Sequence, residues 1–392
     1  MSMCKVSGFQ ENESKEMMGF VYELLRSAVM DRDPRFDIGT TPDWDAMMKY
    51  ASKEGVLAWL WDGICKLPKE QQPNRFQRIS WDLSARQIWN RYELQHKVLL
   101  DILSKCNANQ IRLLLMKGET LSIYYPKPKS RPSGDIDIFL FEDFEKGNNL
   151  FVQGQHSETD KHTSFYYKGV NVENHKVVIN PNTETKKRVS EYIANSLDKV
   201  IYNPEGYYEL SPIENFIFVM IHAYSHVHFG INTSLLNLKN ITDLAVILNA
   251  KDNHLPASEL IHQMKELHIE KTFDLTVYLS EWLLAVDLSQ YHVNVVEEKD
   301  VAIIKDYFLH DGFYCTIPIS LPYFKQVVLY WKRYHKIGHV YRYMPKWKSL
   351  NRLMLSDLYL VTMRKLFKVT NVQSFSEGIR QKYRNHNQQG AK

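Results

Sequence analysis

The sequence predicts an α+β fold in which a small mixed sheet lies between mainly helical regions. Apolar residues recur at helical spacing before residue 110 and again after Ser190, and short apolar or alternating runs typical of strands fill the stretch between them. The expected divisions are a helical region at 1–104, an α/β core at 105–185, a helical domain at 186–320 that closes the cleft, and a basic helical tail at 321–392.

Three helices are expected in the N-terminal region. The first begins near Phe20, and the second follows Asp43, a residue type whose side chain caps helix N-termini. Gly55 stands at or just past the end of this second helix. The third is indicated by apolar residues within 98–103 and stops near Asn107, where turn-forming residues begin.

The core is expected to combine short strands with short helices. It lacks the long strand–helix series of a Rossmann-type sheet, which excludes that fold. The expected strands lie at 111–116, 135–140, 163–167 and 170–179, and the expected helices at 118–125 and 142–152. After the core, the clearest helical segments are 214–228, 235–248, 275–286 and 301–308.

The composition excludes several classes of protein. Of the 392 residues, 44% are hydrophobic and 24% are charged, which is unlike disordered, collagen-like or coiled-coil chains. The chain has no run of about 18 apolar residues that would span a membrane. No apolar leader follows Met1, so we expect a cytoplasmic location. The four cysteines are too widely spaced for a zinc knuckle and are expected to be reduced thiols.

The charge is distributed unevenly along the chain. Residues 322–392 contain 15 Lys and Arg against two acids, a net charge of +13, which leaves −9 on residues 1–321 out of the total of +4. Such a tail can pack against the acidic body of the protein or contact an anionic partner. Aromatic residues interleave with the basic ones at 330–348, a mixture that suits nucleic acid. The segment 353–367 has Leu and Met on one side, which suits an anionic membrane surface.

Asp135 and Asp137 form the pattern that points most directly to chemistry. They stand at alternate positions of the strand 135–140, so their side chains share one face, while Ile136 and Ile138 share the other. Two adjacent carboxylates repel each other unless a cation lies between them. Carboxylate oxygens together with phosphate oxygens are the ligands that Mg²⁺ prefers.

Glu173 is the expected third carboxylate. On the predicted strand it shares a polar face with Asn171 and His175, whereas Glu158 and Asp160, the alternatives, lie in a polar loop. Three carboxylates would complete a metal site for in-line displacement at a phosphate.

Phosphate contacts are expected from two loops. The first strand ends at Lys117-Gly118, where a glycine allows close approach to the backbone and the following helix N-terminus favours an anion. Arg131, Ser133 and Gly134 lie in the loop directly before Asp135 and can also reach a phosphate.

These motifs resemble the nucleotidyltransferase superfamily, whose best-known member is DNA polymerase beta. Within it, the chain is similar to a bacterial group of uncharacterised nucleotidyltransferases over residues 20–250. The superfamily has a glycine-containing turn, an Asp-x-Asp strand and a lone acid on a later strand. The matching positions in this sequence are Lys117-Gly118-Glu119, Asp135 with Asp137, and Glu173.

The resemblance implies transfer of a nucleoside monophosphate from an NTP, with ATP favoured, to an acceptor, with loss of pyrophosphate. Asp135 and Asp137 would hold the nucleotide-bound Mg²⁺ or Mn²⁺. With Glu173 they would hold a second ion that activates the acceptor hydroxyl, and Glu173 could act as the base. The acceptor can be a small molecule, a sugar, a peptide or a protein. The alternative is an inactive nucleotide-binding or interaction protein on the same fold.

Several further residues are candidates for acceptor or nucleotide contacts. His222 and His226 stand four residues apart, a spacing that can bind zinc, but Ala223 replaces the glutamate of the H-E-x-x-H motif. The resemblance implies that their helix lies near the active site, with Asp243 on the next helix. His175 is a further candidate because it follows Glu173 on the same strand face.

Overall fold

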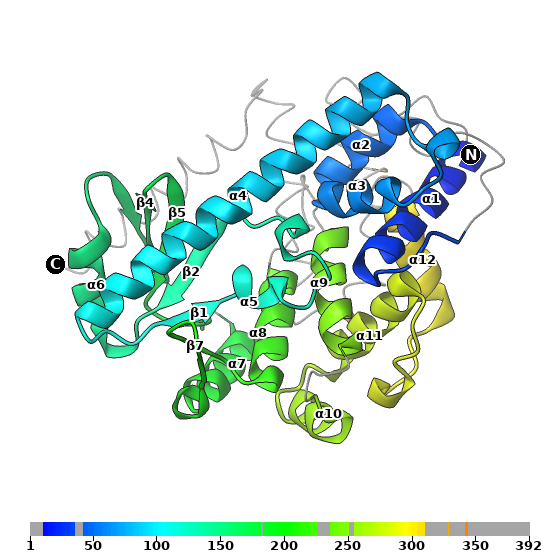
Figure 1. Ribbon diagram of the computed structural model, residues 1–392. Helices are drawn as coiled ribbons and strands as arrows, with labels where there is room; N and C mark the ends of the chain where they lie inside the picture. The colour runs from blue at the N-terminus through cyan, green and yellow to red at the C-terminus, as the bar shows by residue number, and fades with distance from the viewer. Residues whose placement is uncertain are drawn as a thin grey trace.

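The computed structural model describes residues 11–35, 42–181, 183–225, 236–250, 255–309, 328 and 342–343. Helices lie before and after a central mixed sheet, which confirms the predicted α+β class (Figure 1). The predictions for His226 and for all but three residues of the 321–392 tail lie outside the described residues.

The N-terminal helices follow the predicted signals only in part. The first begins at Glu11 rather than near Phe20, because the polar residues 11–16 show no apolar periodicity, and a fourth helix that was not predicted follows Gly55 at Leu57–Cys65. The Asp43 side chain accepts hydrogen bonds from the backbone N–H groups of Asp45 and Ala46, as its N-cap position predicts. The predicted third helix is the C-terminal end of one long helix, which begins at an Asn74–Gln77 capping box and runs for 34 residues, about 50 Å. The helices are α1 (Glu11–Val29), α2 (Trp44–Lys53), α3 (Leu57–Cys65) and α4 (Arg75–Ala108).

The sheet contains seven strands in the order β3-β4-β5-β2-β1-β7-β6. At its centre, β2 pairs parallel with β5 and antiparallel with β1. The strands are β1 (Leu114–Met116), β2 (Asp135–Phe139), β3 (His156–Glu158), β4 (His162–Tyr167), β5 (Val170–His175), β6 (Ile201–Asn203) and β7 (Tyr207–Glu209).

The strand predictions were wrong in two respects. β1 begins at Leu114 and β5 ends at His175, so both strands are shorter than expected. The sequence also did not predict β3, β6 and β7, because three residues are too few to show an alternation. The β6–β7 hairpin extends the sheet past residue 185, and its edge strand exposes Ile201 and Tyr202.

One face of the sheet packs on the second half of α4. Ile136, Ile138 and Val172 share a buried cluster with the apolar residues within 98–103 of that helix and with the end of α6 (Phe144–Phe151). In Figure 1, the second half of α4 passes across the strands, and its first half lies beside α2 and α3. This face is closed by apolar packing.

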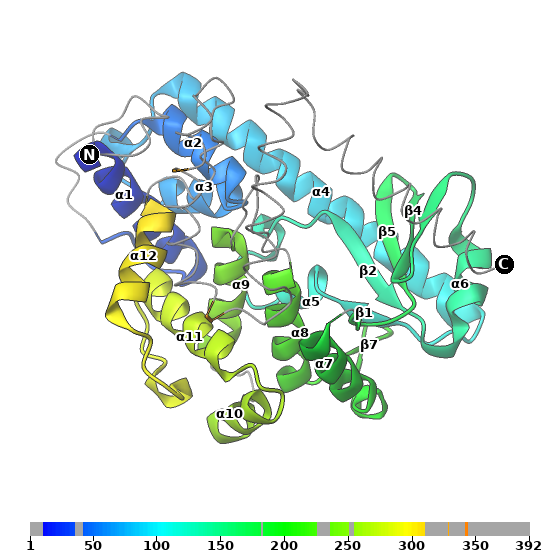
Figure 2. The same ribbon diagram turned by 180° about the vertical axis from the view of Figure 1, so that it is seen from behind.

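The opposite face carries the polar residues. Met116 and Phe139 on this face join the larger helical core, and Asp135 and Asp137 alternate with Ile136 and therefore share it. Figures 1 and 2 both show α8 beside α5 and close to β1. The carboxylates thus face the helical side of the molecule.

The helices after the sheet form one core with those before it. The Arg26 guanidinium on α1 donates to the carbonyl groups of Leu283 and Trp282 at 2.7 and 2.8 Å, and Leu238 N–H donates to Glu54 Oε2 at 3.0 Å. None of the helices in the described part of the chain has the length and apolar character needed to cross a membrane. The remaining helices are α5 (Glu119–Ser122), α7 (Glu184–Ala194), α8 (Pro212–Ser225), α9 (Leu238–Asn249), α10 (Ala257–Glu266), α11 (Glu270–Leu284) and α12 (Glu298–Leu309).

Candidate active site

Strand register brings three carboxylates together. In the parallel pair β2–β5, Asp137 lies opposite Glu173, and Asp135 stands two residues before Asp137 on the same face. One oxygen from each carboxylate lies within 4.8 Å of the other two. Glu158, an alternative third acid, instead pairs with Lys176 at 2.6 Å. The structure therefore groups Glu173 with the aspartate pair.

Asp137 is the buried centre of this group. Its side chain is 2% exposed, and its Oδ1 lies 2.8 Å from both Lys117 Nζ and His175 Nε2. Burial raises the pKa of the Asp137 carboxyl, but the Lys117 ammonium and the hydrogen bond from His175 outweigh burial and hold that pKa far below its usual range. Asp137 is therefore ionised at neutral pH.

The neighbouring carboxyls behave differently from Asp137. Burial, and then the negative charge of Asp137, raise the pKa of Asp135 above its usual value. A hydrogen bond from His175 lowers the pKa of Glu173 against the opposing effect of burial. Without a metal ion, the ionised form of Asp135 is thus disfavoured in the fold, a property that suits a carboxylate that binds a cation.

The Lys117-Gly118 turn places a positive charge at this centre. Gly118 has φ of 46° and ψ of −112°, a conformation that favours glycine because a Cβ atom would be strained there. Lys117, also at positive φ, extends its ammonium between Asp137 and α8, where it lies 3.5 Å from His222 Nε2. Two histidines were predicted on this helix. His222 contacts Lys117, which in turn pairs with Asp137, and His226 is outside the described residues.

Arg131 and Asp243 bind each other. Arg131 Nε and Nη2 donate to the two Asp243 oxygens at 2.7 and 2.9 Å, Nη1 donates to the Gly118 carbonyl at 3.0 Å, and both residues are 3% exposed. Burial raises the pKa of Asp243, but the charges of Arg131 and Lys239 outweigh it and lower that pKa to about 2. Arg131 thereby holds the Gly118 turn, and Asp243 holds Arg131. Ligand contacts by these two residues remain predictions.

The loop before β2 is held by α4. Ser133 Oγ donates to the Asp135 carbonyl at 3.2 Å. Arg91, which the sequence analysis missed, donates to the carbonyl groups of Gly134 and Gly169 at 2.9 and 3.1 Å. An arginine on a long helix carries no local signal for this role. Phosphate contacts by Ser133 and Gly134 remain predictions.

Two further residues near the carboxylates were also missed. His162 lies opposite His175 in the β4–β5 pair, and its Nδ1 is 3.4 Å from Glu173 Oε2. Burial lowers the pKa of His162. Lys161 directly precedes His162. Burial, and then the positive charge of Lys117, lower the pKa of Lys161, and the three carboxylates oppose this shift. Only the strand pairing would have revealed either residue, because both lie outside the predicted strand 163–167.

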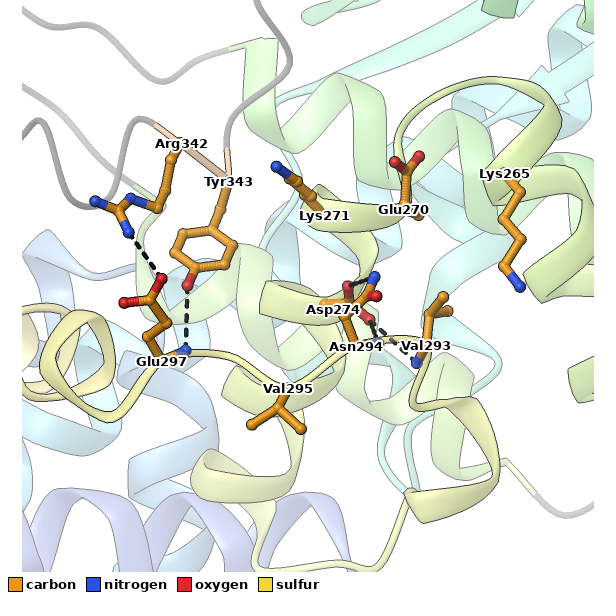
Figure 3. Close-up of a pocket in the computed structure, with 10 residues that line it drawn as sticks. All are labelled: Lys265, Glu270, Lys271, Asp274, Val293, Asn294, Val295, Glu297, Arg342 and Tyr343. Carbon is orange, nitrogen blue, oxygen red and sulfur yellow. Dashed lines mark hydrogen bonds and ion pairs between the residues drawn. The ribbon is translucent and has the colours of Figure 1, made fainter.

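A second polar region lies on the helical side of the molecule. A pocket of about 740 Å³ occurs there, and none of the predicted site residues lines it (Figure 3). The Tyr343 hydroxyl donates to Asp300 at 2.9 Å, and Arg342 pairs with Glu297 at 3.1 Å. At these two residues, the basic tail does contact acidic groups of the body. The lining residues are Lys265, Glu270, Lys271, Asp274, Val293, Asn294, Val295, Glu297, Arg342 and Tyr343.

Comparison with known proteins identifies the class. Residues 40–285, well over half of the chain, match the family described as "Uncharacterised nucleotidyltransferase". The chain therefore belongs to that family, which confirms the resemblance seen in the sequence motifs. No curated protein and no solved structure gives a significant match.

Proposed function

We propose that this protein transfers a nucleoside monophosphate from an NTP to a hydroxyl-bearing acceptor and releases pyrophosphate. The observation that carries the proposal is the group of three carboxylates, Asp135, Asp137 and Glu173, with oxygens within 4.8 Å of one another. Membership of a nucleotidyltransferase family supports the same class of reaction.

The donor set fits a hard divalent cation. Three carboxylates offer the oxygen ligands that Mg²⁺ or Mn²⁺ prefers. The raised pKa of Asp135 adds support, because burial and then the negative charge of Asp137 disfavour its ionised form, which a bound cation would stabilise. Asp135 and Asp137 would hold the nucleotide-bound ion, and Glu173 would join them for a second ion. A bound ion supplies charge stabilisation at the transferred phosphate and lowers the pKa of the acceptor hydroxyl.

The protein groups account for the remaining steps. Glu173, whose lowered pKa keeps it ionised, accepts the proton of the acceptor hydroxyl. The acceptor oxygen then forms a bond to the α-phosphorus, and the bond from that phosphorus to the bridging oxygen breaks. Pyrophosphate leaves with the electron pair. Lys117 contacts the phosphates from the turn at the end of β1, and Gly118 allows them to approach the backbone.

ATP is the favoured donor, and the acceptor can be a small molecule, a sugar, a peptide or a protein. One observation favours an inactive nucleotide-binding protein as the alternative. Glu119 follows Gly118 in the turn, at a position where the resemblance expects Ser or Gly, and it pairs with His96 of α4. A carboxylate there adds negative charge close to the expected phosphates.

The test combines nucleotide binding with product formation. Thermal unfolding is measured with each NTP, with and without Mg²⁺, on the wild type, on the Asp135→Asn/Asp137→Asn double variant and on Asp160→Asn. The last is a control, because Asp160 is an exposed acid outside the carboxylate group. A ligand at 100 times its dissociation constant stabilises the fold by about 2.7 kcal/mol.

We expect an Mg²⁺-dependent shift with one NTP in the wild type and the control, and none in the double variant. Release of pyrophosphate from that NTP in the presence of the acceptor separates an enzyme from the inactive alternative. The absence of a shift with every NTP, in a wild type that unfolds cooperatively, would refute the proposal.

A further inference from the structure

Two histidines and a glutamate converge beside the aspartate pair. His162 on β4 lies directly opposite His175 on β5, and Glu173 stands two residues before His175 on the same face. His162 Nδ1 and His175 Nε2 lie 3.4 and 3.5 Å from the same oxygen, Glu173 Oε2. One ligand atom of each residue lies within 4.8 Å of the other two. Two neighbouring strands thus bring two imidazole nitrogens and one carboxylate oxygen close together.

The hydrogen bonding of this cluster is incomplete. His162 Nδ1 is buried and has no hydrogen-bond partner among the described residues, although Glu173 Oε2 is 3.4 Å away. A nitrogen that faces a carboxylate at this distance without a hydrogen bond is the arrangement that a shared cation would complete. His175 is 1% exposed, so its ring is held rigidly by packing. Both features distinguish the cluster from histidines exposed on a surface.

We propose that His162, Glu173 and His175 form a binding site for a divalent transition-metal ion of the Zn²⁺ type. Imidazole nitrogen is a ligand that Zn²⁺ accepts readily, whereas Mg²⁺ strongly prefers oxygen. Two histidines and one glutamate are also a known zinc ligand set that leaves one position open. The three donors therefore favour a metal different from the one that suits Asp135 and Asp137.

Glu173 belongs to both ligand sets. The Zn²⁺-type ion would take the place of the second Mg²⁺ or Mn²⁺ ion on the Glu173 side of the centre, which deepens the proposed function. The inference rests on that function only for the role of the ion, since binding itself can be measured without any nucleotide. His175 Nε2 also lies 2.8 Å from Asp137 Oδ1. A metal ion on this nitrogen would replace its hydrogen bond to Asp137, so a change at His175 would disturb both sets. Among the described residues, His162 forms an ion pair with Glu173 and no hydrogen bond or ion pair with either aspartate, so it is the cleaner residue to change.

The experiment measures metal binding to the full-length, chelator-treated protein. Equilibrium dialysis against Zn²⁺ alone, and then against Zn²⁺ with a large excess of Mg²⁺, gives the stoichiometry and affinity. The variants are His162→Gln and His175→Gln, and the control is His156→Gln. His156 lies on the neighbouring strand β3, is exposed, and has its Nδ1 3.1 Å from the Gly154 carbonyl.

We expect one Zn²⁺ per chain that excess Mg²⁺ does not displace. His162→Gln and His175→Gln should each lower the affinity for Zn²⁺ by more than about 100-fold. Loss of a residue that only hydrogen-bonds to a metal ligand already lowers metal affinity by about 10–100-fold. His156→Gln should bind as the wild type does. Retention of the tight ion by His162→Gln, or its displacement by Mg²⁺ in the wild type, would overturn the inference.

Two further measurements keep the test decisive. Co²⁺ added to the wild type should produce visible absorption bands that Zn²⁺ abolishes, and their absence would count against the site even if a variant failed to fold. NTP-induced stabilisation that needs Mg²⁺ and Asp135 reports on the proposed function separately. Zn²⁺ binding without any NTP response would refute the proposed function but support the metal site. An NTP response without tight Zn²⁺ binding would support the function and refute the metal site.

Discussion

Lys117 and Asp137 form a buried ion pair, with Nζ 2.8 Å from Oδ1, at the point where the carboxylates converge. The Lys117 side chain is 13% exposed and the Asp137 side chain 2%. An ammonium in this place neutralises part of the negative charge and competes with any divalent cation that uses the same oxygen. The pair therefore links the stability of the metal-free protein to its affinity for metal.

Replacement of Lys117 by Met should separate these two effects. Without metal, Lys117→Met leaves the buried Asp137 carboxylate with the hydrogen bond from His175 but without its ammonium partner, and should destabilise the fold by up to about 3–5 kcal/mol. Mg²⁺ should restore more stability to the variant than to the wild type, because the ion no longer competes with the ammonium. Urea unfolding in chelator and in Mg²⁺ measures both. Lys168→Met, which removes an exposed lysine of the β4–β5 turn, is the control. An equal response to Mg²⁺ in wild type and Lys117→Met would show that Lys117 does not compete.

Asp135→Asn should stabilise the metal-free protein while it abolishes transfer. The pKa of Asp135 is raised in the folded protein, so the ionised form is disfavoured there relative to the unfolded chain at neutral pH. Removal of the charge should raise stability by up to about 2 kcal/mol, the range of single stabilising substitutions. Thermal unfolding in chelator measures the gain, and Asp160→Asn should show none. A loss of stability would mean that Asp135 is satisfied without metal.

The Arg131–Asp243 pair should behave as one unit. Arg131→Met leaves a carboxylate that is 3% exposed without its main partner and should cost about 3–5 kcal/mol. Arg131→Lys should also destabilise, because an ammonium cannot donate two parallel bonds to a carboxylate. The double variant Arg131→Met/Asp243→Asn should lose less than the sum of the single losses. Arg86→Met, at an exposed pair with Asp82, provides the surface comparison. Strict additivity would argue against coupling.

The same pair predicts part of the acid sensitivity. The pKa of Asp243 falls from its ordinary 3.8 to about 2 in the folded protein. The ionised form is therefore stabilised by folding, and its contribution is present above about pH 4 and lost as the pH falls towards 2. The free energy of unfolding, measured with urea at several values between pH 5 and pH 2, should fall less in Asp243→Asn than in the wild type. The expected difference across this interval is on the order of 2 kcal/mol. An identical fall in both proteins would refute this assignment.

Some features of the site follow from spacing within one segment. Asp135 and Asp137 share a face because they stand two residues apart on a strand, and Glu173 and His175 share a face for the same reason. The Asp43 cap, the long apolar runs of the helices and the α+β class are equally local and could be predicted. The family resemblance rested on the same short motifs.

The partners of these residues depend on how distant segments meet. Arg131 and Asp243 are 112 residues apart in the chain, and nothing local marks them as a pair. His162 joins the site only because β4 and β5 pair in one particular register. A shift of two residues would keep every side chain on its face and change every partner across the strands. Local spacing therefore indicates which residues face the site, whereas packing and register determine what each of them contacts.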